Sequence, residues 1–289
     1  MGIRVIARLR TYLSFIRFSH SVFALPFALT GALLAAREHP LTWQRVGWII
    51  AAMVAARSAA MGFNRLVDAG YDARNPRTAM RELPRGVMSR TEASMFVAVS
   101  SAAFVGTAWM ISPLCAALSP LALAIVFWYS LAKRYTFYTQ AFLGLAMAVA
   151  PVGGWLAAGG EAARWEPWLL GVAIGLWVGG FDVLYACQDH AFDRDHGLRS
   201  IPVRFGIERS LLISRGMHVA TILCMAALAL VIPLGPIYLA GVALVALLLA
   251  YEQSLVSSTD LSQVKRAFDM NGYVGILYFL TTAAAVFVR

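Results

Sequence analysis

The sequence predicts an all-α integral membrane protein, with nine transmembrane helices around a central cavity and short cytoplasmic cap helices. Of its 289 residues, 60% are hydrophobic and 13% are charged, whereas about 25% of the residues of a soluble domain are charged. Residues 93–132 form a 40-residue stretch without Asp, Glu, Lys or Arg, and one helix needs roughly 20 apolar residues to cross a bilayer. The apolar stretches show no alternation of polar and apolar residues, which excludes a transmembrane β-barrel.

Nine apolar segments follow one another along the chain. Two long uncharged stretches, 93–132 and 216–251, each hold two spans because prolines interrupt them. The interruptions are expected at Pro113 and Pro120 in the first stretch and at residues 233–236 in the second. The predicted spans are 18–36, about 43–63, two within 93–132, 135–160, about 167–189, two within 216–251, and 270–288.

The residues before the first span predict a helix that lies in the membrane interface. Between residues 3 and 16, apolar side chains recur at helical spacing and basic side chains occupy the opposite face. The apolar set is Ile6, Leu9, Leu13 and Ile16, and the basic set is Arg4, Arg8 and Arg10. This basic-then-apolar start resembles a signal peptide, but we expect it to remain as the first span.

The basic residues predict the orientation in the membrane. The formal charge is +9, and 19 of the 24 Lys and Arg residues precede the first span or lie in the loops after spans 2, 4, 6 and 8. The positive-inside rule therefore places the N-terminus and these loops in the cytoplasm and the C-terminus outside. Because these residues are spread over several loops, no nucleic-acid partner is expected.

A polar stripe follows the second predicted span. Asn64, Asp68 and Asp72 lie at positions i, i+4 and i+8, so one face of a helix carries all three. Arg57 lies two turns before Asn64 on the same face. A charged residue within a span is costly and usually serves a function.

A second stripe follows the sixth predicted span. Asp182, Tyr185, Asp189 and Asp193 lie at i, i+3, i+7 and i+11, again on one helix face. Both stripes end at the cytoplasmic interface, and we expect them to face each other across the cavity. A solvated helix face is the alternative for one such stripe, but two stripes in a chain so poor in charge favour a shared site.

The chemistry of the stripes indicates a ligand. Carboxylates stacked on one face repel one another unless a cation joins them. Hard oxygen donors suit Mg²⁺, which completes its coordination with water and phosphate oxygens. Nearby Arg and Lys side chains would neutralise the outer phosphate oxygens. The two stripes therefore predict a site for a magnesium-bound diphosphate.

These residues resemble the two motifs of the UbiA superfamily of intramembrane prenyltransferases. The family's N-x-x-x-D-x-x-x-D motif matches the first stripe, and its Y-x-x-x-D-x-x-x-D motif matches Tyr185 and the two aspartates after it. The resemblance extends over nearly the whole chain and includes Arg17-Phe-Ser-His20, Asn75-Pro-Arg77-Thr78, Lys133-Arg134 and Arg199-Ser-Ile-Pro202-Val-Arg204.

Among the branches of the family, the sequence is most similar to the 4-hydroxybenzoate polyprenyltransferases. This group includes members implicated in the futalosine route to menaquinone, which are thought to prenylate a carboxylated dihydroxynaphthalene. One departure is Arg199, which stands where many relatives carry Lys. The charge is kept there, but the geometry of the donors differs.

The resemblance implies a Mg²⁺-dependent transfer of a polyprenyl group from a polyprenyl diphosphate to an aromatic acid, in ubiquinone or menaquinone biosynthesis. The implied metal ligands are the four motif aspartates Asp68, Asp72, Asp189 and Asp193, with Asn64 orienting them. The implied phosphate-binding residues are Arg65, Lys133, Arg134, Arg199 and Arg204.

The remaining implied roles concern the acceptor. Tyr185 would stabilise an allylic cation through its ring, and Asp182 would orient the acceptor or take its proton. Arg57, with Arg17 or His20, would pair with the carboxylate of a small aromatic acid. Two alternatives stay open, since Arg57 could instead pair with Asp182 and His20 could serve only packing.

Three other functions are alternatives. A family member with another acceptor, such as haem or chlorophyllide, would differ only in the acceptor pocket. A transporter would place charges near the membrane midplane, whereas the acids here cluster at one end. The membrane CDP-alcohol phosphotransferases carry a D-G-x-x-A-R string that this sequence lacks.

Residues 1–289 are expected to form one UbiA-type prenyltransferase domain surrounded by lipid. Its motif loops are residues 64–92 and 189–210, which face the cytoplasm together with the N-terminus. The expected location is the cytoplasmic (inner) membrane of a bacterium.

Overall fold

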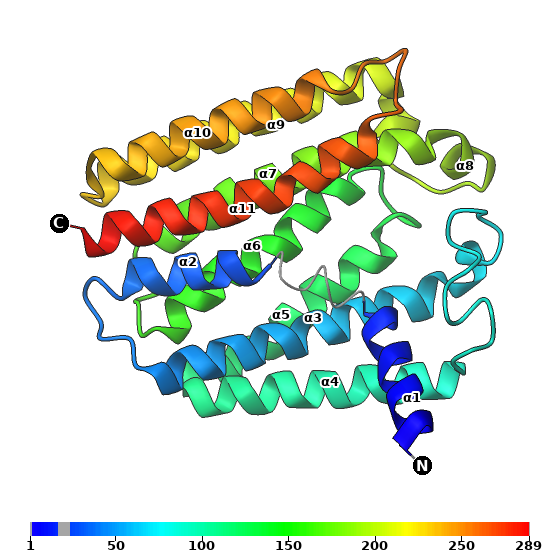
Figure 1. The fold of residues 1–289 in the computed structure, drawn as a ribbon, viewed down its shortest axis with the longest axis horizontal. Coiled ribbons are helices and arrows are strands. Elements are labelled where there is room, and N and C mark those ends of the chain that lie inside the picture. Colours follow the sequence, from blue (N-terminus) through cyan, green and yellow to red (C-terminus); the bar gives the residue numbers. More distant parts are fainter. Residues whose placement is uncertain (1, 17–23, 289) are drawn as a thin grey trace.

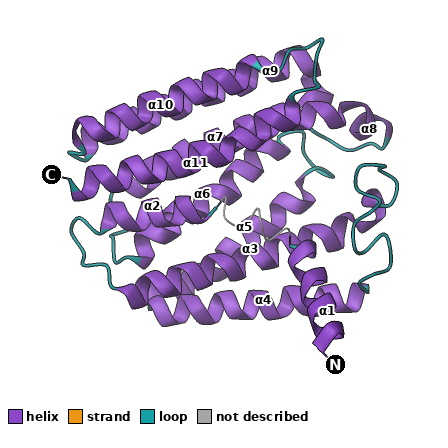
Figure 2. Cartoon of the chain, in the orientation of Figure 1, coloured by secondary structure: helices purple, strands orange, loops and turns teal. Residues whose placement is uncertain are grey.

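The computed structural model describes residues 2–16 and 24–288 and is built of helices (Figure 1, Figure 2). Within these two ranges the chain forms no strand. In chain order the elements are α1 (Gly2–Phe15), α2 (Leu25–Ala35), α3 (Trp43–Asp72), α4 (Arg90–Ile111), α5 (Pro113–Ala132), α6 (Thr139–Ala157), α7 (Glu166–Ala186), the 3-10 helix η2 (Cys187–Asp189), α8 (His190–Asp195), α9 (Ile201–Val231), α10 (Gly235–Ser254) and α11 (Val264–Phe287). The predicted all-α class is confirmed.

Eight helices of the described chain are long and apolar enough to cross a membrane. They are α3 to α7 and α9 to α11, with η2 and α8 continuing the run of α7. Helix α2 is apolar but has 11 residues, and residues 17–23 of the segment before it lie outside the described ranges. Helix α2 and the eight long helices correspond to the nine predicted spans. Figure 1 shows the C-terminus at the end opposite to α8, as an odd number of crossings requires.

The sequence predicts three proline-containing interruptions in the long uncharged stretches. Two of them separate helices in the structure. Helix α4 ends at Ile111 and α5 begins at Pro113, with the Ser112 hydroxyl accepting a hydrogen bond from the Cys115 N–H at 3.1 Å. Helices α9 and α10 are likewise separated at residues 232–234. Pro120 lies inside α5 and ends no helix, so the break in the first stretch comes at Pro113 alone.

Helix α7 lies at the centre of the bundle. In the most apolar 18-residue segment of the run formed by α7, η2 and α8, 61% of the residues are buried, compared with 11% in the corresponding segments of α4 and α5. Trp177 of α7 is fully buried and meets the ring of Phe27 on α2 edge to face, with the ring centroids 5.1 Å apart. Few apolar side chains of α4 and α5 are fully buried, as is typical of helices that face lipid.

Glycines bring α6 into close contact with its neighbours on both sides. A Cβ atom at Gly144 would collide with the backbone carbonyl of Gly175 on α7, and one at Gly154 would collide with the carbonyl of Ala28 on α2. Small residues let membrane helices approach backbone to backbone. Helix α6 is thereby fixed between α2 and α7.

Helix α1 crosses the bundle instead of joining it. In Figure 1 its axis runs across α3 and α4 near the end that carries α8. Arg8 of α1 pairs with Glu92 of α4 at 2.7 Å. The helix covers the residues of the predicted interfacial helix, and its place in the membrane interface stays a prediction.

The end of the bundle with α8 differs in detail from the sequence expectation. The helix from Asp182 to Asp193 is not the one uninterrupted α-helix expected, because α7 ends at Ala186 and η2 intervenes before α8. A 3-10 helix winds about three residues per turn, so it changes the direction of the side chains that follow. Of the two expected cap helices, η2 and α8 provide the second, whereas residues 73–89 form a series of turns.

Candidate functional site

A cavity of about 200 Å³ lies near the end of the bundle that carries α8. Its wall combines the end of α3 and the turns after it, the end of α5, the start of α6, the end of α7 with η2 and α8, and the segment before α9. The structure brings both predicted stripes to this wall: Asn64, Asp68, Asp72, Asp182, Tyr185, Asp189 and Asp193.

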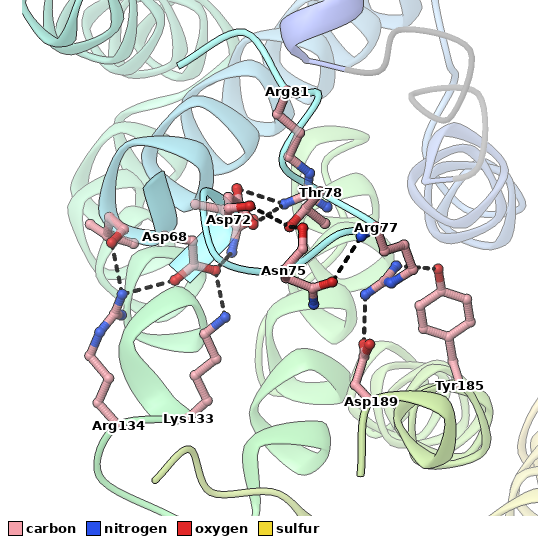
Figure 3. A network of polar contacts seen from close by, with 12 residues as sticks. Asp68, Asp72, Asn75, Arg77, Thr78, Arg81, Lys133, Arg134, Tyr185 and Asp189 are labelled. Atoms are coloured by element: carbon pink, nitrogen blue, oxygen red, sulfur yellow. Dashed lines mark hydrogen bonds and ion pairs between the residues drawn. The ribbon is translucent and has the colours of Figure 1, made fainter. Parts of the chain in front are cut away.

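Asp68 is the centre of the first group of charges. Its side chain is 5% exposed, and its two oxygens accept hydrogen bonds from Lys133 Nζ and Arg134 Nη2, each at 2.8 Å (Figure 3). Asn64 Nδ2 donates to the same carboxylate at 3.4 Å. Lys133 and Arg134 directly follow α5, so the end of one helix supplies the counter-charges for a carboxylate on another. Such compensation is required because a buried charge without a partner is costly.

Asp72 lies one turn further along α3 and has a partner in the loop after it. Arg81 Nη1 lies 2.7 and 2.8 Å from the two oxygens of Asp72. Thr78 Oγ1 donates a hydrogen bond to the backbone carbonyl of Asp72 at 3.1 Å. These contacts fold residues 73–89 back onto the end of α3.

Arg77 connects this loop to the second stripe. Its Nη2 donates to Asp189 Oδ2 at 2.6 Å, and its Nη1 donates to Tyr185 Oη at 3.0 Å (Figure 3). Its guanidinium carbon lies 5.6 Å from the centroid of the Tyr185 ring. A single side chain from the loop after α3 therefore holds both the end of α7 and η2.

Asp182 and Asp193 line the cavity without an ion pair to any residue in the described ranges. Tyr129 of α5, which also lines the cavity, interacts electrostatically with Asp182 and with Arg57. Arg57 and Asp182 form no ion pair with each other within the described chain, so the alternative of a structural pair between them is not observed. The Nε of Arg57 is buried without a hydrogen-bond partner among the described residues.

Only some of the predicted basic residues lie on the cavity wall. Lys133 and Arg199 line the cavity, and Arg199 also donates to the backbone carbonyl of Tyr135. The others lie outside the cavity wall: Arg57, Arg65, Arg134 and Arg204. Arg17 and His20 lie outside the described residues.

Position explains why Arg65 and Arg204 are not at the cavity. Arg65 follows Asn64 directly on α3, so its side chain points to another face of the helix, where it is 4% exposed. Arg204 is exposed and lies against three aromatic rings at 5.3 to 5.7 Å, those of Phe137, Tyr138 and Phe205. The structure therefore places neither arginine on the cavity wall, and their predicted contact with the diphosphate stays a prediction.

Among the wall residues that sequence reasoning missed, Arg77, Arg81 and Tyr129 carry charge or interact with it. The two arginines lie in the Asn75-Pro-Arg77-Thr78 segment and just after it, in a loop dense in Arg. That density was a signal of an anionic partner. The conformation that turns these two side chains toward the carboxylates comes from the turns of the loop, which the sequence does not specify residue by residue.

The side chains of the four motif aspartates do not converge on a single metal-binding position. Across the described chain, no three His, Cys, Asp or Glu side chains lie together as a metal cluster. Instead Asp68, Asp72 and Asp189 each pair with Arg or Lys. The oxygen donors themselves fit a hard divalent cation, and all four line one cavity.

The fold and this site define a helical integral membrane protein with a polar, charged chamber at one end. The model of the UbiA prenyltransferase family matches residues 24–280. The chain belongs to this family and is a prenyltransferase.

Two curated relatives have the same name. The 4-hydroxybenzoate octaprenyltransferase of Alkalilimnicola ehrlichii is 32% identical over 255 residues, which are 87% of this chain and 85% of that relative. The 4-hydroxybenzoate octaprenyltransferase of Enterobacter sp. (strain 638) is 33% identical over 239 residues, which are 78% of each chain.

Solved structures share the fold. A UbiA homologue from Aeropyrum pernix K1 superimposes with a TM-score of 0.84 at 37% identity, over 91% of this chain and 96% of that chain. A UbiA homologue from Archaeoglobus fulgidus bound to GPP and Mg²⁺ superimposes with a TM-score of 0.74, over 96% of this chain and 99% of that chain. At 19% identity this second likeness shows the fold alone.

Proposed function

We propose that the protein transfers a polyprenyl group from a polyprenyl diphosphate to a small aromatic acid, in a Mg²⁺-dependent reaction of ubiquinone or menaquinone biosynthesis. The acceptor is 4-hydroxybenzoate or a related carboxylated dihydroxynaphthalene. One observation carries the proposal: two aspartate-bearing segments of a prenyltransferase line the same cavity, and basic side chains contact three of their carboxylates. The names of the relatives support the aromatic acceptor.

Four residues are the proposed metal ligands, Asp68, Asp72, Asp189 and Asp193. When bound, Mg²⁺ would neutralise charge on the diphosphate and so make it a better leaving group. Asp68, Asp72 and Asp189 would then exchange their basic partners for the metal. The released Arg and Lys side chains would turn to phosphate oxygens, for which their donors are suited.

The proposed phosphate-binding residues are those basic side chains that line the cavity or contact its carboxylates: Arg77, Arg81, Lys133, Arg134 and Arg199. They would stabilise the negative charge that develops on the diphosphate as the C–O bond breaks. The bonding electrons leave with the diphosphate, and an allylic cation remains. The ring of Tyr185 lies in the cavity wall and would face that cation.

The acceptor is proposed to lie deeper, between Asp182 and Arg57. Asp182 would orient the phenolic hydroxyl or take its proton, and the ring carbon ortho to that hydroxyl would bond to the cation and lose its own proton. The buried Nε of Arg57 has no partner in the described chain, which supports pairing with an acceptor carboxylate. Arg17 and His20 stay proposed partners of the same group.

We also propose that the whole chain acts as one domain in a bacterial inner membrane, with the cavity on the cytoplasmic side. Of the 24 Lys and Arg residues, 19 precede the first predicted span or follow predicted spans 2, 4, 6 and 8, which supports this orientation.

The test is a reconstitution with two acceptors offered separately. Purified protein receives Mg²⁺, a polyprenyl diphosphate, and either 4-hydroxybenzoate or 1,4-dihydroxy-6-naphthoate, and mass spectrometry detects the prenylated product. Product from the benzoate assigns the ubiquinone-type reaction, and product from the naphthoate alone assigns the menaquinone-type reaction. With neither product and no Mg²⁺-dependent release of diphosphate, the proposal is overturned in favour of another acceptor.

A further inference from the structure

Tyr71 occupies a special position on the cavity wall. It lies on α3 between Asp68 and Asp72, and it lines the cavity. Three cations approach its ring: Arg134 Cζ at 5.3 Å from the centroid, Arg74 Cζ at 5.5 Å and Lys133 Nζ at 5.8 Å. Two of these cations, Lys133 and Arg134, are the partners of Asp68.

The ring attracts these cations by its π face. A cation within about 6 Å of an aromatic centroid is stabilised by the negative charge density of that face. The Tyr71 hydroxyl donates no hydrogen bond to a residue of the described chain, so the ring and not the hydroxyl makes the contact. Lys133 and Arg134 are therefore held from two sides, by the Asp68 carboxylate and by the Tyr71 ring.

We propose that Tyr71 is a positioning residue that keeps Lys133 and Arg134 beside the cavity when Asp68 changes its partner. This inference rests on the proposed function, in which Asp68 takes a metal and the two cations turn to diphosphate oxygens. An ion pair with Asp68 alone would be lost at that moment, whereas the contact with the ring does not depend on the state of the carboxylate. The two cations then meet the diphosphate already oriented, which lowers the entropic cost of binding it.

The experiment compares Tyr71→Phe, which keeps the ring, with Tyr71→Leu, which removes it. Calorimetry measures the binding of inorganic pyrophosphate with Mg²⁺, and steady-state kinetics measure kcat and KM for the prenyl diphosphate. We expect Tyr71→Leu to weaken pyrophosphate binding and to raise that KM by about tenfold, with kcat changed by about twofold or less. Tyr71→Phe is expected to match the wild type.

Tyr251→Leu is the matched control. Tyr251 also contacts an arginine, with Arg266 Cζ 5.9 Å from its centroid, but it lies on α10 and does not line the cavity. Its loss is expected to leave pyrophosphate binding unchanged. Tyr71→Met gives a second ringless side chain in case the leucine variant does not fold, and the melting temperature in detergent checks each variant.

The outcomes separate this inference from the proposed function. Wild-type binding by a folded ringless variant, or equal weakening in Tyr71→Phe and Tyr71→Leu, overturns the role of the ring while the proposed function stands. Failure of the wild type to bind pyrophosphate with Mg²⁺ overturns the proposed function, and the role of Tyr71 with it.

Discussion

The carboxylates of the cavity are held by side chains from different segments of the chain. Asp68 pairs with residues after α5, Asp72 with Arg81, and Asp189 with Arg77. Each pair ties two segments together as well as balancing charge. Replacing either partner therefore changes both the electrostatics of the cavity and the fit of its wall, and a test of function has to separate these effects.

Isosteric amides make that separation at the acidic residues. Asp68→Asn and Asp189→Asn keep the size and a hydrogen-bond acceptor for the neighbouring cations, but they remove the negative charge that a metal ligand needs. We expect each change to lower prenyl transfer at least about a hundredfold, because charge stabilisation of this kind usually contributes that much. Product formation by mass spectrometry gives the rate, and size-exclusion chromatography in detergent shows whether the protein is folded.

Asp195→Asn is the control for both. Asp195 is on α8 close to the site, but it is exposed, pairs with Arg194 and does not line the cavity. Its activity is expected to equal that of the wild type. Full activity in Asp68→Asn or Asp189→Asn would remove these residues from the proposed metal site.

Arg77 is the second residue to test, because it contacts Asp189 and Tyr185 at once. Arg77→Gln removes the positive charge, and it leaves one nitrogen donor in place of the two, Nη1 and Nη2, that contact Tyr185 and Asp189. We expect kcat/KM for the prenyl diphosphate to fall about 10- to 1,000-fold, since both the leaving group and the cation-facing ring lose their support. Arg85→Gln lies in the same loop, is exposed and does not line the cavity, so it should have no effect. An equal loss in both variants would show that the loop needs only its total charge.

At the scale of single residues, the sequence predicts which acidic side chains line the cavity better than it predicts which basic side chains do. The seven acidic, amide and tyrosine positions all reach the cavity, because helical spacing places them along the end of α3 and along the helical run of α7, η2 and α8. Arg77 and Arg81 escape prediction because they lie in turns, where no periodicity specifies direction. Arg204 lies against aromatic rings and not on the cavity wall, and its sequence position does not distinguish these two surroundings.

Among the elements, α6 shows how backbone contact fixes the bundle around the cavity. Its start contributes Thr139 and Gln140 to the cavity wall. Its later turns pack against α2 and α7 through glycines. A shift of α6 against either neighbour would therefore change the wall at the same time.

Gly154→Ala tests this packing. The added methyl group would meet the backbone carbonyl of Ala28, which is not the end of a flexible side chain and cannot turn away. Overpacking of this kind destabilises by about 1–3 kcal/mol, so we expect a melting temperature several degrees lower in a fluorescence-based assay in detergent. Gly153→Ala is the control on the same helix, because nothing lies near the added Cβ there. Equal melting temperatures for the two variants would contradict the close contact between α6 and α2.

The helices themselves are predicted well, because long uncharged runs and prolines define them. The departure comes at the end of α7, where the spacing of polar residues continues as if the helix did. The η2 turn interrupts it, yet Asp189 and Asp193 still reach the cavity. A stripe of side chains at helical spacing thus predicts a shared face, but it does not detect a local change of helix type within that face.

Over the whole molecule, the two ends of the bundle differ in the number and the exposure of their arginine side chains. At the end opposite the cavity, Arg164 pairs with Glu166 at 2.6 Å and Arg45 donates to the carbonyl of Ala158 at 3.0 Å. Exposed tryptophans lie beside them, Trp43 and Trp165, as at a membrane–water interface. At the cavity end, the loops carry many arginines that are exposed. This asymmetry is the physical basis of the proposed orientation.

Labelling of introduced cysteines tests that orientation. In a variant without the three native cysteines, which are all free, Glu161→Cys places a thiol in the loop before α7 and Arg85→Cys places one in the loop after α3. The loop residues are exposed in both cases. In intact bacterial cells, a maleimide that cannot cross the membrane is expected to label Glu161→Cys and not Arg85→Cys. In inverted vesicles the pattern should reverse.

Asp260→Cys is the internal control for this labelling experiment. Residue 260 lies between α10 and α11 at the cavity end and is exposed, so it has to follow Arg85→Cys in every preparation. The opposite pattern, with positions 85 and 260 labelled in intact cells, would place the cavity outside. A prenyl acceptor made in the cytoplasm would then have no direct access to the site, and the charge asymmetry of the loops would require another cause. Labelling as expected fixes the side of the membrane on which the cavity lies, because α3, α5 and α7 all present their cavity-lining ends to that side.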